Sequence, residues 1–156
     1  MPAPVILAID QGTTNTKALL VREDGSVLAS AARAMRVDYP KPGWAEQDAM
    51  AIWDAVASLI TELAAVPDTI VEALAISNQR ETIVLWDAAT GLPLAPAVIW
   101  QCRRSADRCV ALAGHGPEIA ARSGLGLDPL FPAAKIGWLL DAIPDARRRA
   151  EQGELR

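Results

Sequence analysis

The N-terminal end of the chain constrains the fold more than any other part, because it contains three strand patterns in close succession. Residues 5–9 form a continuous apolar run, which predicts a strand buried on both faces. Residues 16–21 and 27–34 give two further strand patterns, and the Asp24-Gly25 pair between them suits the positive φ angles of a tight hairpin turn. The chain is therefore expected to open with an antiparallel meander of three strands.

A helix is expected after the meander. Residues 39–44 contain two prolines and a glycine, which exclude a helix at that point. Asp48 can then act as the N-cap of a helix that ends at Pro67. The apolar residues of this segment recur at helical spacing and form one stripe: Ile52, Trp53, Val56, Leu59, Ile60 and Leu63.

The second half of the chain predicts further strands and then helices. Residues 70–76 are nearly all apolar and predict a central strand, with residues 82–86 as its neighbour. Because a crossover helix normally joins parallel strands, this order predicts an α/β fold with a mixed sheet and helices on its faces. After residue 100 the pattern becomes helical, with segments near residues 105–113, 118–122, 133–143 and 145–154. The length of 156 residues fits one domain spanning residues 1–156.

Composition and charge argue against several classes of protein. The net charge of −4 is unfavourable for nucleic acid or an anionic membrane as the main partner. No apolar run approaches the roughly 18 residues of a membrane span, and the N-terminus lacks the basic segment of a signal peptide. Cys102 and Cys109 are expected to be reduced, buried residues, which predicts a cytoplasmic location. His115, flanked by glycines, is expected in a solvated loop, and no metal site made wholly of protein ligands is visible.

Residues 10–17, with the sequence D-Q-G-T-T-N-T-K, form the first polar constellation. Gly12 allows a ligand to approach the backbone closely, and Asp10 places a carboxylate at the end of a strand. Hydroxyl groups and a cation complete the set: Thr13, Thr14, Thr16 and Lys17. Such a set suits phosphate oxygens and their Mg²⁺, although the ending of a Walker A loop is absent. The alternative interpretation is a polar hairpin turn.

Three further segments contain residues that could carry chemistry. Residues 77–82 are six polar residues between apolar runs, and adjacent Arg80 and Glu81 could address vicinal hydroxyl groups. The alternative for this segment is a solvated connection with an incidental ion pair. Trp100 could cover the carbon face of a small polyol, or it could be part of the core. Residues 128–131, D-P-L-F, form the last segment, and the alternative there is a turn that caps a helix.

Five motifs occur in this order along the chain: D-Q-G-T-T-x-x-K, P-K-P-G-W-x-E-x-D, N-Q-R-E-T, W-Q-C-R-R and D-P-x-F-x-x-x-K. Together they resemble the FGGY family of carbohydrate kinases and, within that family, the glycerol kinases. The resemblance covers residues 7–155. The first motif is shared across the family, whereas N-Q-R-E-T with W-Q-C-R-R is more particular to the glycerol kinases.

The resemblance implies an actin-like, ribonuclease-H-like fold of two domains with the active site in the cleft between them. This chain would be the N-terminal part, without the second, C-terminal domain. The implied cofactors are ATP and Mg²⁺, with Asp10 as the metal-binding residue. The residues implied to bind the nucleotide lie on the same loop: Asp10, Gly12, Thr13, Thr14, Asn15 and Lys17. Lys17 stands where glycerol kinases usually have an arginine, so the charge is kept and the planar fork is lost.

The residues implied to bind the acceptor are Arg80, Glu81, Trp100 and Leu130. Leu130 is a departure from the family pattern, because glycerol kinases have a tyrosine at this position that contacts glycerol. Residues 132–134, P-A-A, likewise replace a family S-G-T, so the wall of the pocket is more apolar. The aspartate that serves as general base, and the adenine site, are expected in the part that this chain lacks. No catalytic residue is therefore assigned, and residues 1–156 alone are expected to be inactive.

The expected function is ATP-dependent phosphorylation of a polyol or sugar hydroxyl, first of all the conversion of glycerol to glycerol 3-phosphate. Two alternatives stay open. One is a kinase of another polyol or of a pentulose, and the other is a non-catalytic nucleotide-binding module of the same fold. ATP and a small polyol or sugar are the expected partners, and a homo-oligomer of the full-length parent is left open.

Overall fold

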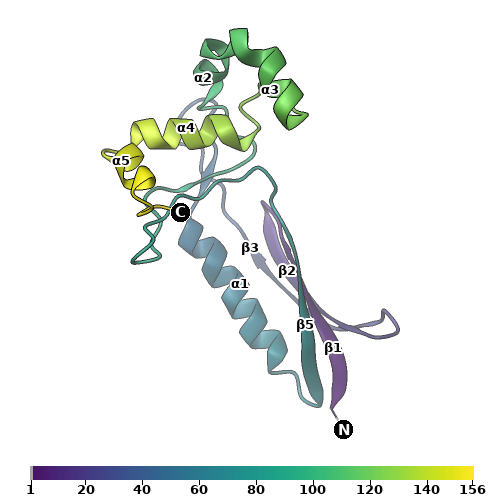
Figure 1. The fold of residues 1–156 in the computed structure, drawn as a ribbon. Coiled ribbons are helices and arrows are strands. Elements are labelled where there is room, and N and C mark those ends of the chain that lie inside the picture. The colour runs from purple at the N-terminus through teal and green to yellow at the C-terminus, as the bar shows by residue number, and fades with distance from the viewer. Residues whose placement is uncertain (1) are drawn as a thin grey trace. The chain divides into compact units, whose positions relative to one another are not determined.

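The computed structural model describes residues 2–156, which form two compact units (Figure 1). Unit 1 comprises the chain up to Val37 together with Asp48–Gln79. Unit 2 comprises Asp38–Gln47 and Arg80–Arg156. Each unit has its own sheet, a four-stranded one in unit 1 and a two-stranded one in unit 2.

Unit 1 is built on a mixed sheet with the strand order β3-β2-β1-β5 (Figure 1). β1 (Ala3–Gln11), β2 (Asn15–Arg22) and β3 (Val27–Ala34) pair antiparallel, and β5 (Thr69–Asn78) pairs parallel to β1. Gly25 has a φ of 81° in the turn between β2 and β3, as the hairpin chemistry requires. The predicted antiparallel meander and mixed sheet are thus confirmed.

Helix α1 (Ala49–Ala64) is the crossover between β3 and β5. The carboxylate of Asp48 caps it by accepting hydrogen bonds from the backbone amides of Met50 at 2.8 Å and Ala51 at 3.2 Å. Within the predicted apolar stripe of this helix, Trp53 is an exception, because it is 62% exposed. Buried side chains from β1, β2 and α1 make the core of unit 1: Val5, Leu7, Ile9, Ala18, Leu20, Leu59 and Leu63.

β5 lies at the edge of the sheet in the part of the chain that the structure describes. Its extended conformation and its parallel pairing with β1 agree with the sequence pattern. Its burial does not, because Leu74 and Ile76 are 51% and 62% exposed. The strand that the sequence places in the centre of a sheet therefore presents apolar side chains to solvent in these residues.

The prediction that residues 82–86 form a neighbouring strand of β5 is wrong. This segment belongs to unit 2, and among the described residues it makes isolated bridges, of Ile83 with Val98 and of Trp86 with Pro93. A proline has no backbone amide to donate, so the pairing of Trp86 with Pro93 is not extended into a regular ladder.

Unit 2 combines a short sheet with a group of helices (Figure 1). β4 (Glu46–Gln47) pairs antiparallel with β6 (Ala97–Val98). The predicted helical segments are confirmed, with ends that differ by a few residues. They are α2 (Ala106–Ala111), α3 (Gly116–Ser123), α4 (Pro132–Ala142) and α5 (Ala146–Glu151), with the 3₁₀ helix η1 (Ala113–His115) after α2.

The loop of residues 39–44 is held in unit 2 by two tryptophans and an arginine. Trp44 and Trp138 pack edge to face, with ring centroids 5.1 Å apart. The guanidinium carbon of Arg104 lies 4.0 Å from the ring centroid of Trp44, and its Nη2 lies 2.6 Å from a carboxylate oxygen of Glu46. The Arg104 side chain is only 3% exposed, so this cation–π contact and this ion pair form largely away from water. Trp44 therefore has a packing role.

Cys102 and Cys109 are buried free thiols, as the sequence predicts. His115 is exposed, although it lies in the 3₁₀ helix η1 rather than in an irregular loop. Within residues 2–156, no helix combines the length and the apolar character that crossing a membrane requires.

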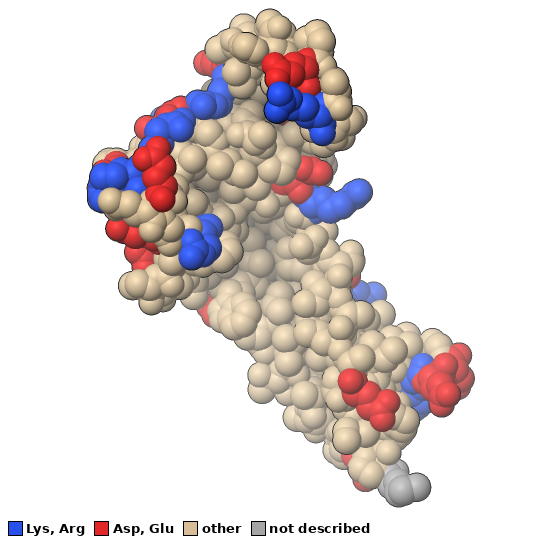
Figure 2. Space-filling model, in the orientation of Figure 1, with Lys and Arg blue, Asp and Glu red and all other residues tan. Residues whose placement is uncertain are grey.

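Arginines and acidic side chains adjoin one another over the helices of unit 2. Figure 2 shows blue and red atoms next to each other in the region of α5. Asp141 pairs with both Arg108 and Arg147, and Asp145 pairs with Arg148. Hydrogen bonds from these arginines lower the pKa of both aspartates. Because the pairs are partly exposed to water, each is expected to add little to stability.

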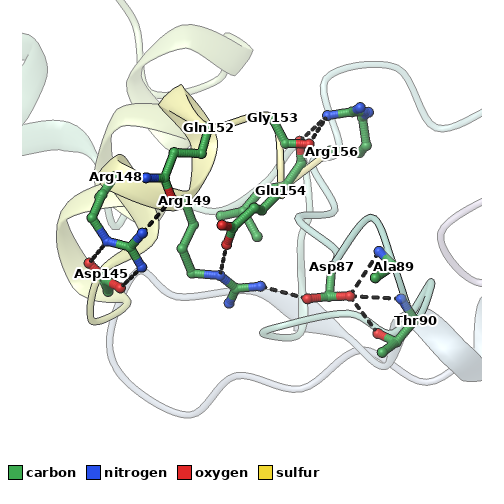
Figure 3. A network of polar contacts seen from close by, with 11 residues as sticks. Asp87, Ala89, Thr90, Asp145, Arg148, Arg149, Gln152, Gly153, Glu154 and Arg156 are labelled. Atoms are coloured by element: carbon green, nitrogen blue, oxygen red, sulfur yellow. Dashed lines mark hydrogen bonds and ion pairs between the residues drawn. The ribbon is translucent and has the colours of Figure 1, made fainter.

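A polar network holds the last residues of the chain against the turn that begins at Asp87 (Figure 3). One oxygen of the Asp87 carboxylate accepts hydrogen bonds from the backbone amides of Ala89 and Thr90 and from the Thr90 hydroxyl, at 2.7–3.0 Å. The other oxygen accepts a hydrogen bond from Arg149 at 2.6 Å. Arg149 also donates to Glu154 at 3.2 Å. The network therefore fastens α5 and the residues after it to this turn.

This network predicts that Asp87 stabilises the fold more at neutral than at acid pH. Hydrogen bonds from Thr90 and from Arg149 outweigh burial and lower the pKa of Asp87 below its usual value of 3.8. A carboxyl group with a depressed folded-state pKa stabilises the fold above its unfolded-state pKa, and this contribution is lost as the pH falls through the folded-state pKa. Urea unfolding from pH 7 to about pH 3 should therefore show a smaller loss of stability on acidification in Asp87→Asn than in the wild type.

Asp54→Asn is the matched control, because Asp54 is an exposed residue of α1 outside this network. It should leave the pH dependence of unfolding as in the wild type. Superimposable curves for Asp87→Asn and the wild type would show that the network does not stabilise the fold through this carboxylate.

Candidate functional site

The turn between β1 and β2 carries the residues predicted to bind phosphate. Asp10 and Lys17 are directly opposite in the β1–β2 register, and both are exposed. Opposite residues of an antiparallel pair project from the same face of the sheet, so a carboxylate and an ammonium group face solvent together. Thr14 and Asn15 in the turn are also exposed, and Thr13 is half-buried. The structure thus brings the predicted phosphate-binding residues together at one end of β1 and β2.

Gly12 closes this turn by a close approach of two backbone segments. Its amide donates a hydrogen bond to the carbonyl oxygen of Asn15 at 3.0 Å. A Cβ atom at residue 12 would lie 2.9 Å from that oxygen, closer than a real Cβ comes to another atom. The need for glycine here therefore comes from space rather than from a positive φ.

Gln79 supports the turn and was not singled out from the sequence. Its amide nitrogen donates to the side-chain oxygen of Gln11 at 3.2 Å and to the carbonyl of Gly12 at 3.3 Å. Its side-chain oxygen accepts from the Thr13 hydroxyl at 3.1 Å. The sequence does contain a signal for this contact, because Gln79 lies in the polar stretch directly after β5. The carboxyl ends of the parallel strands β1 and β5 meet at one edge of the sheet, which brings Gln79 to the β1–β2 turn. Gln79 therefore holds the backbone of the β1–β2 turn.

Thr16 does not have the role expected for its hydroxyl. The side chain is fully buried, and its hydroxyl has no hydrogen-bond partner within the described residues. It lies opposite Gln11 in the sheet, next to exposed Lys17. Because successive residues of a strand point to opposite faces, Thr16 faces the core where Lys17 faces solvent. Thr13 and Thr14 remain the threonines that a phosphate could reach.

The chemistry of this turn fits Mg²⁺ carried by a nucleotide. Mg²⁺ is usually held by one or two carboxylates together with phosphate oxygens and water, and Asp10 supplies one exposed carboxylate. Within residues 2–156, no group of three or more His, Cys, Asp or Glu side chains could hold a metal ion. The donor set therefore suits a metal–phosphate complex better than a bare ion.

The residues predicted to bind the acceptor belong to unit 2. Glu81 is half-buried and has a φ of 67°, which is rare for a residue other than glycine. Leu130 is 36% exposed, and its amide donates to the carboxylate of Asp128 at 2.7 Å. Trp100 follows the buried strand β6 and is 41% exposed. Arg80, next to Glu81, is exposed.

Lys135 joins two of these residues and was not predicted as a site residue. It lies on α4 and is fully buried. Its ammonium group donates to the carbonyl oxygen of Glu81 at 2.7 Å and to that of Leu130 at 2.5 Å. Glu81 and Leu130 are thus brought together, whereas Arg80 and Trp100 do not share this ammonium.

Burial lowers the pKa of Lys135 from its usual 10.5, because the charged form loses hydration. The nearby groups of Cys102, Glu81 and Asp128 act in the opposite direction. Both hydrogen bonds of Lys135 therefore come from a desolvated ammonium group.

Comparison with known proteins identifies relatives over nearly the whole chain. The profile of the FGGY family of carbohydrate kinases, N-terminal domain, matches residues 5–154. An apulose kinase of Pectobacterium atrosepticum is 51% identical over 158 residues, which cover 99% of this chain and 32% of the relative. A glycerol kinase of Alcanivorax borkumensis is 46% identical over 157 residues, covering 97% of this chain and 32% of the relative. The chain thus spans about a third of the length of these relatives.

Solved structures of sugar and polyol kinases share the fold. The glycerol kinase of Plasmodium falciparum with ADP superimposes with a TM-score of 0.93 at 29% identity, over 98% of this chain and 32% of that one. The xylulose kinase of Rhodospirillum rubrum superimposes with a TM-score of 0.84 at 29% identity, over 91% of this chain and 30% of that one. The fold of this chain is therefore the actin-like, ribonuclease-H-like fold of these kinases, as expected.

The close approach at Gly12 predicts that Gly12→Ala destabilises the protein. The added Cβ must push against the Asn15 carbonyl, and overpacking of this kind typically costs about 1–3 kcal/mol. Urea unfolding measures the change. Gly126→Ala is the matched control, because a Cβ at residue 126 meets nothing within 4 Å and this glycine does not have a positive φ. An equal effect of both substitutions would contradict the described turn geometry.

Proposed function

The chain belongs to the FGGY family of carbohydrate kinases, and from this premise we propose that its full-length protein transfers a phosphoryl group from ATP to a hydroxyl of a small polyol or sugar. The observation that carries the proposal is the exposed set at the β1–β2 turn, where the Asp10 carboxylate, the Lys17 ammonium group and the Thr14 hydroxyl face solvent. Enzymes of this kind act mainly by positioning and by electrostatic stabilisation.

In this proposal the β1–β2 turn binds the nucleotide. Asp10 holds the Mg²⁺ of MgATP, and the ion neutralises phosphate charge when it is bound. Lys17 lies opposite Asp10 and adds a positive charge toward the phosphates, as a flexible point charge rather than a planar fork. The remaining contacts to phosphate come from Gly12, Thr13, Thr14 and Asn15.

The acceptor binds to unit 2 in this proposal. Arg80 and Glu81 form charge-assisted hydrogen bonds to its hydroxyls, which are stronger than neutral ones. The exposed indole of Trp100 covers a carbon face, and Leu130 forms an apolar wall. Because the chain covers about a third of its relatives, we place the general base and the adenine site outside residues 1–156. Residues 1–156 alone therefore bind ligands without turnover.

Leu130 and the relatives bear on the choice of acceptor. Glycerol is the acceptor expected from the N-Q-R-E-T and W-Q-C-R-R motifs, and it remains a candidate. Two observations favour a sugar such as apulose. An apolar side chain at residue 130 accommodates a carbon substituent where a tyrosine hydroxyl would otherwise stand, and the apulose kinase is 51% identical against 46% for the glycerol kinase. We therefore place the sugar first and glycerol second.

The cysteines support a proposal for the cellular location. Cys102 and Cys109 are free thiols, which suits a reducing compartment and supports a cytoplasmic location. The proposed partners are ATP and the small acceptor.

Asp10→Ala in the full-length protein tests the nucleotide site. It should lower kcat about a hundredfold or more, because metal-dependent stabilisation of phosphoryl charge amounts to several kcal/mol. Thermal unfolding should change little, since Asp10 is exposed. Asp24→Ala, in the other hairpin of the same sheet, is the control and should keep kcat. Near-normal turnover of Asp10→Ala at saturating MgATP would exclude the assignment. MgATP binding by the wild type without phosphorylation of any acceptor would instead support the non-catalytic module.

Leu130→Tyr tests the acceptor. A tyrosine hydroxyl adds about one hydrogen bond to glycerol, of roughly 0.5–1.5 kcal/mol, which corresponds to an about two- to thirteen-fold lower KM at nearly constant kcat. KM for apulose should rise, because the added ring occupies the space of the carbon substituent. Leu125→Tyr, at another exposed leucine, is the control for both substrates. If Leu130→Tyr leaves both KM values unchanged, residue 130 does not face the acceptor.

A further inference from the structure

A buried ammonium group lies behind the proposed acceptor residues, and its role goes beyond the proposed function on which the inference rests. Lys135 is completely buried, and it is the largest side chain in the described residues with so little exposure. Its two hydrogen bonds go to backbone carbonyls and not to a carboxylate. Burying a charge costs free energy of hydration unless hydrogen bonds or an ion pair replace the lost water.

One of these carbonyls belongs to a residue in an unfavourable conformation. Glu81 has a φ of 67°, and a residue with a side chain keeps such a conformation only where its surroundings hold it. The hydrogen bond from Lys135 to the Glu81 carbonyl supplies such a hold, at 2.7 Å. The hydrogen bond from Lys135 therefore holds the backbone from which the Glu81 carboxylate extends.

The other carbonyl belongs to the loop before α4. The Asp128 carboxylate accepts from the Leu130 amide at 2.7 Å, and the Phe131 amide donates to the Asp128 carbonyl at 3.1 Å. This turn leads directly into α4, which starts at Pro132 and contains Lys135 in its first turns. The Leu130 carbonyl is therefore presented to the same ammonium that holds Glu81.

We propose that Lys135 is the positioning residue of the acceptor pocket. By binding the carbonyls of Glu81 and Leu130 together, it fixes the Glu81 carboxylate relative to the side chain at residue 130. That spacing decides which acceptor fits, since the carboxylate addresses a hydroxyl while residue 130 meets the adjoining part of the acceptor. Lys135 itself does not touch the acceptor in this proposal.

Substitutions of Lys135 in the full-length protein test the inference. Lys135→Met keeps an unbranched chain and removes all donors, whereas Lys135→Gln keeps two N–H donors without the charge. Lys135→Met should raise the acceptor KM about ten- to hundredfold, as expected for losing a charged donor, and Lys135→Gln should raise it less. KM for ATP should stay within about twofold, because the phosphate loop belongs to unit 1.

Leu139→Ala is the matched control for lost stability. Leu139 lies on the same helix and is 2% exposed, but it does not belong to the proposed site. It should lower the melting temperature without changing the acceptor KM. If Leu139→Ala raises the acceptor KM as much as Lys135→Met does, Lys135 acts only through stability and the inference is wrong.

A double substitution measures the positioning directly. Leu130→Tyr changes the KM values for glycerol and apulose in the wild-type background, and these changes should largely disappear in the Lys135→Met background. Residue 130 is then no longer held beside Glu81, so the two effects are not additive. Fully additive effects would overturn the proposal.

Hydrogen exchange separates this inference from the proposed function. If the wild-type protein phosphorylates neither acceptor, the proposed function fails, and Lys135 is then judged by amide exchange alone. Exchange in residues 80–82 and 128–131 should be faster in Lys135→Met than in Leu139→Ala, with Lys135→Gln between them. Equal exchange in the two segments for Lys135→Met and Leu139→Ala would overturn the positioning role.

Discussion

The hydrogen bonds of one buried ammonium group join two of the four residues of the proposed acceptor side, Glu81 and Leu130. A lysine inside a protein loses its hydration, so it must find acceptors, and Lys135 finds them in two backbone carbonyls. The contact is also the means by which α4 reaches two separate chain segments, because Glu81 is 54 residues away in sequence and Leu130 is five. The backbone of Glu81 and of Leu130, two residues proposed to contact the acceptor, is thereby held in place.

The β1–β2 turn, which we propose as the phosphate loop, follows the same principle in unit 1, with an amide in place of an ammonium group. Gln79 forms hydrogen bonds to the backbone and side chains of the turn, while Asp10, Thr14 and Lys17 are exposed to solvent. In both units, then, half-buried or buried polar side chains hold the backbone, and exposed ones are left to bind. Such preorganisation is what phosphoryl-transfer chemistry demands.

The sequence predicted local features well and long-range ones less well. The three strands of the meander, the capping of α1 by Asp48 and the helices of unit 2 follow from patterns within a few residues, which periodicity and turn chemistry report directly. The hydrogen bonds of Gln79 with the β1–β2 turn and of Lys135 with Glu81 join residues 54 to 68 positions apart. Both residues lie in motifs of the sequence, but the motifs do not indicate which distant backbone groups these side chains bind. Residues 82–86 look like a strand, but which segment they pair with depends on tertiary contacts. Burial also depends on tertiary contacts, because Trp53 belongs to the apolar stripe of α1 by its spacing and is nevertheless exposed.

A crystal structure of the full-length protein with Mg²⁺, a non-hydrolysable ATP analogue and apulose or glycerol tests the central claim most directly. The account predicts acceptor hydroxyls within hydrogen-bond distance of Arg80 and Glu81, an acceptor carbon against Leu130, and the Lys135 ammonium on both carbonyls behind them. It also predicts the metal and phosphates at Asp10 and the β1–β2 turn. An acceptor bound away from Glu81 and Leu130, or an ammonium of Lys135 turned away from their carbonyls, would contradict it.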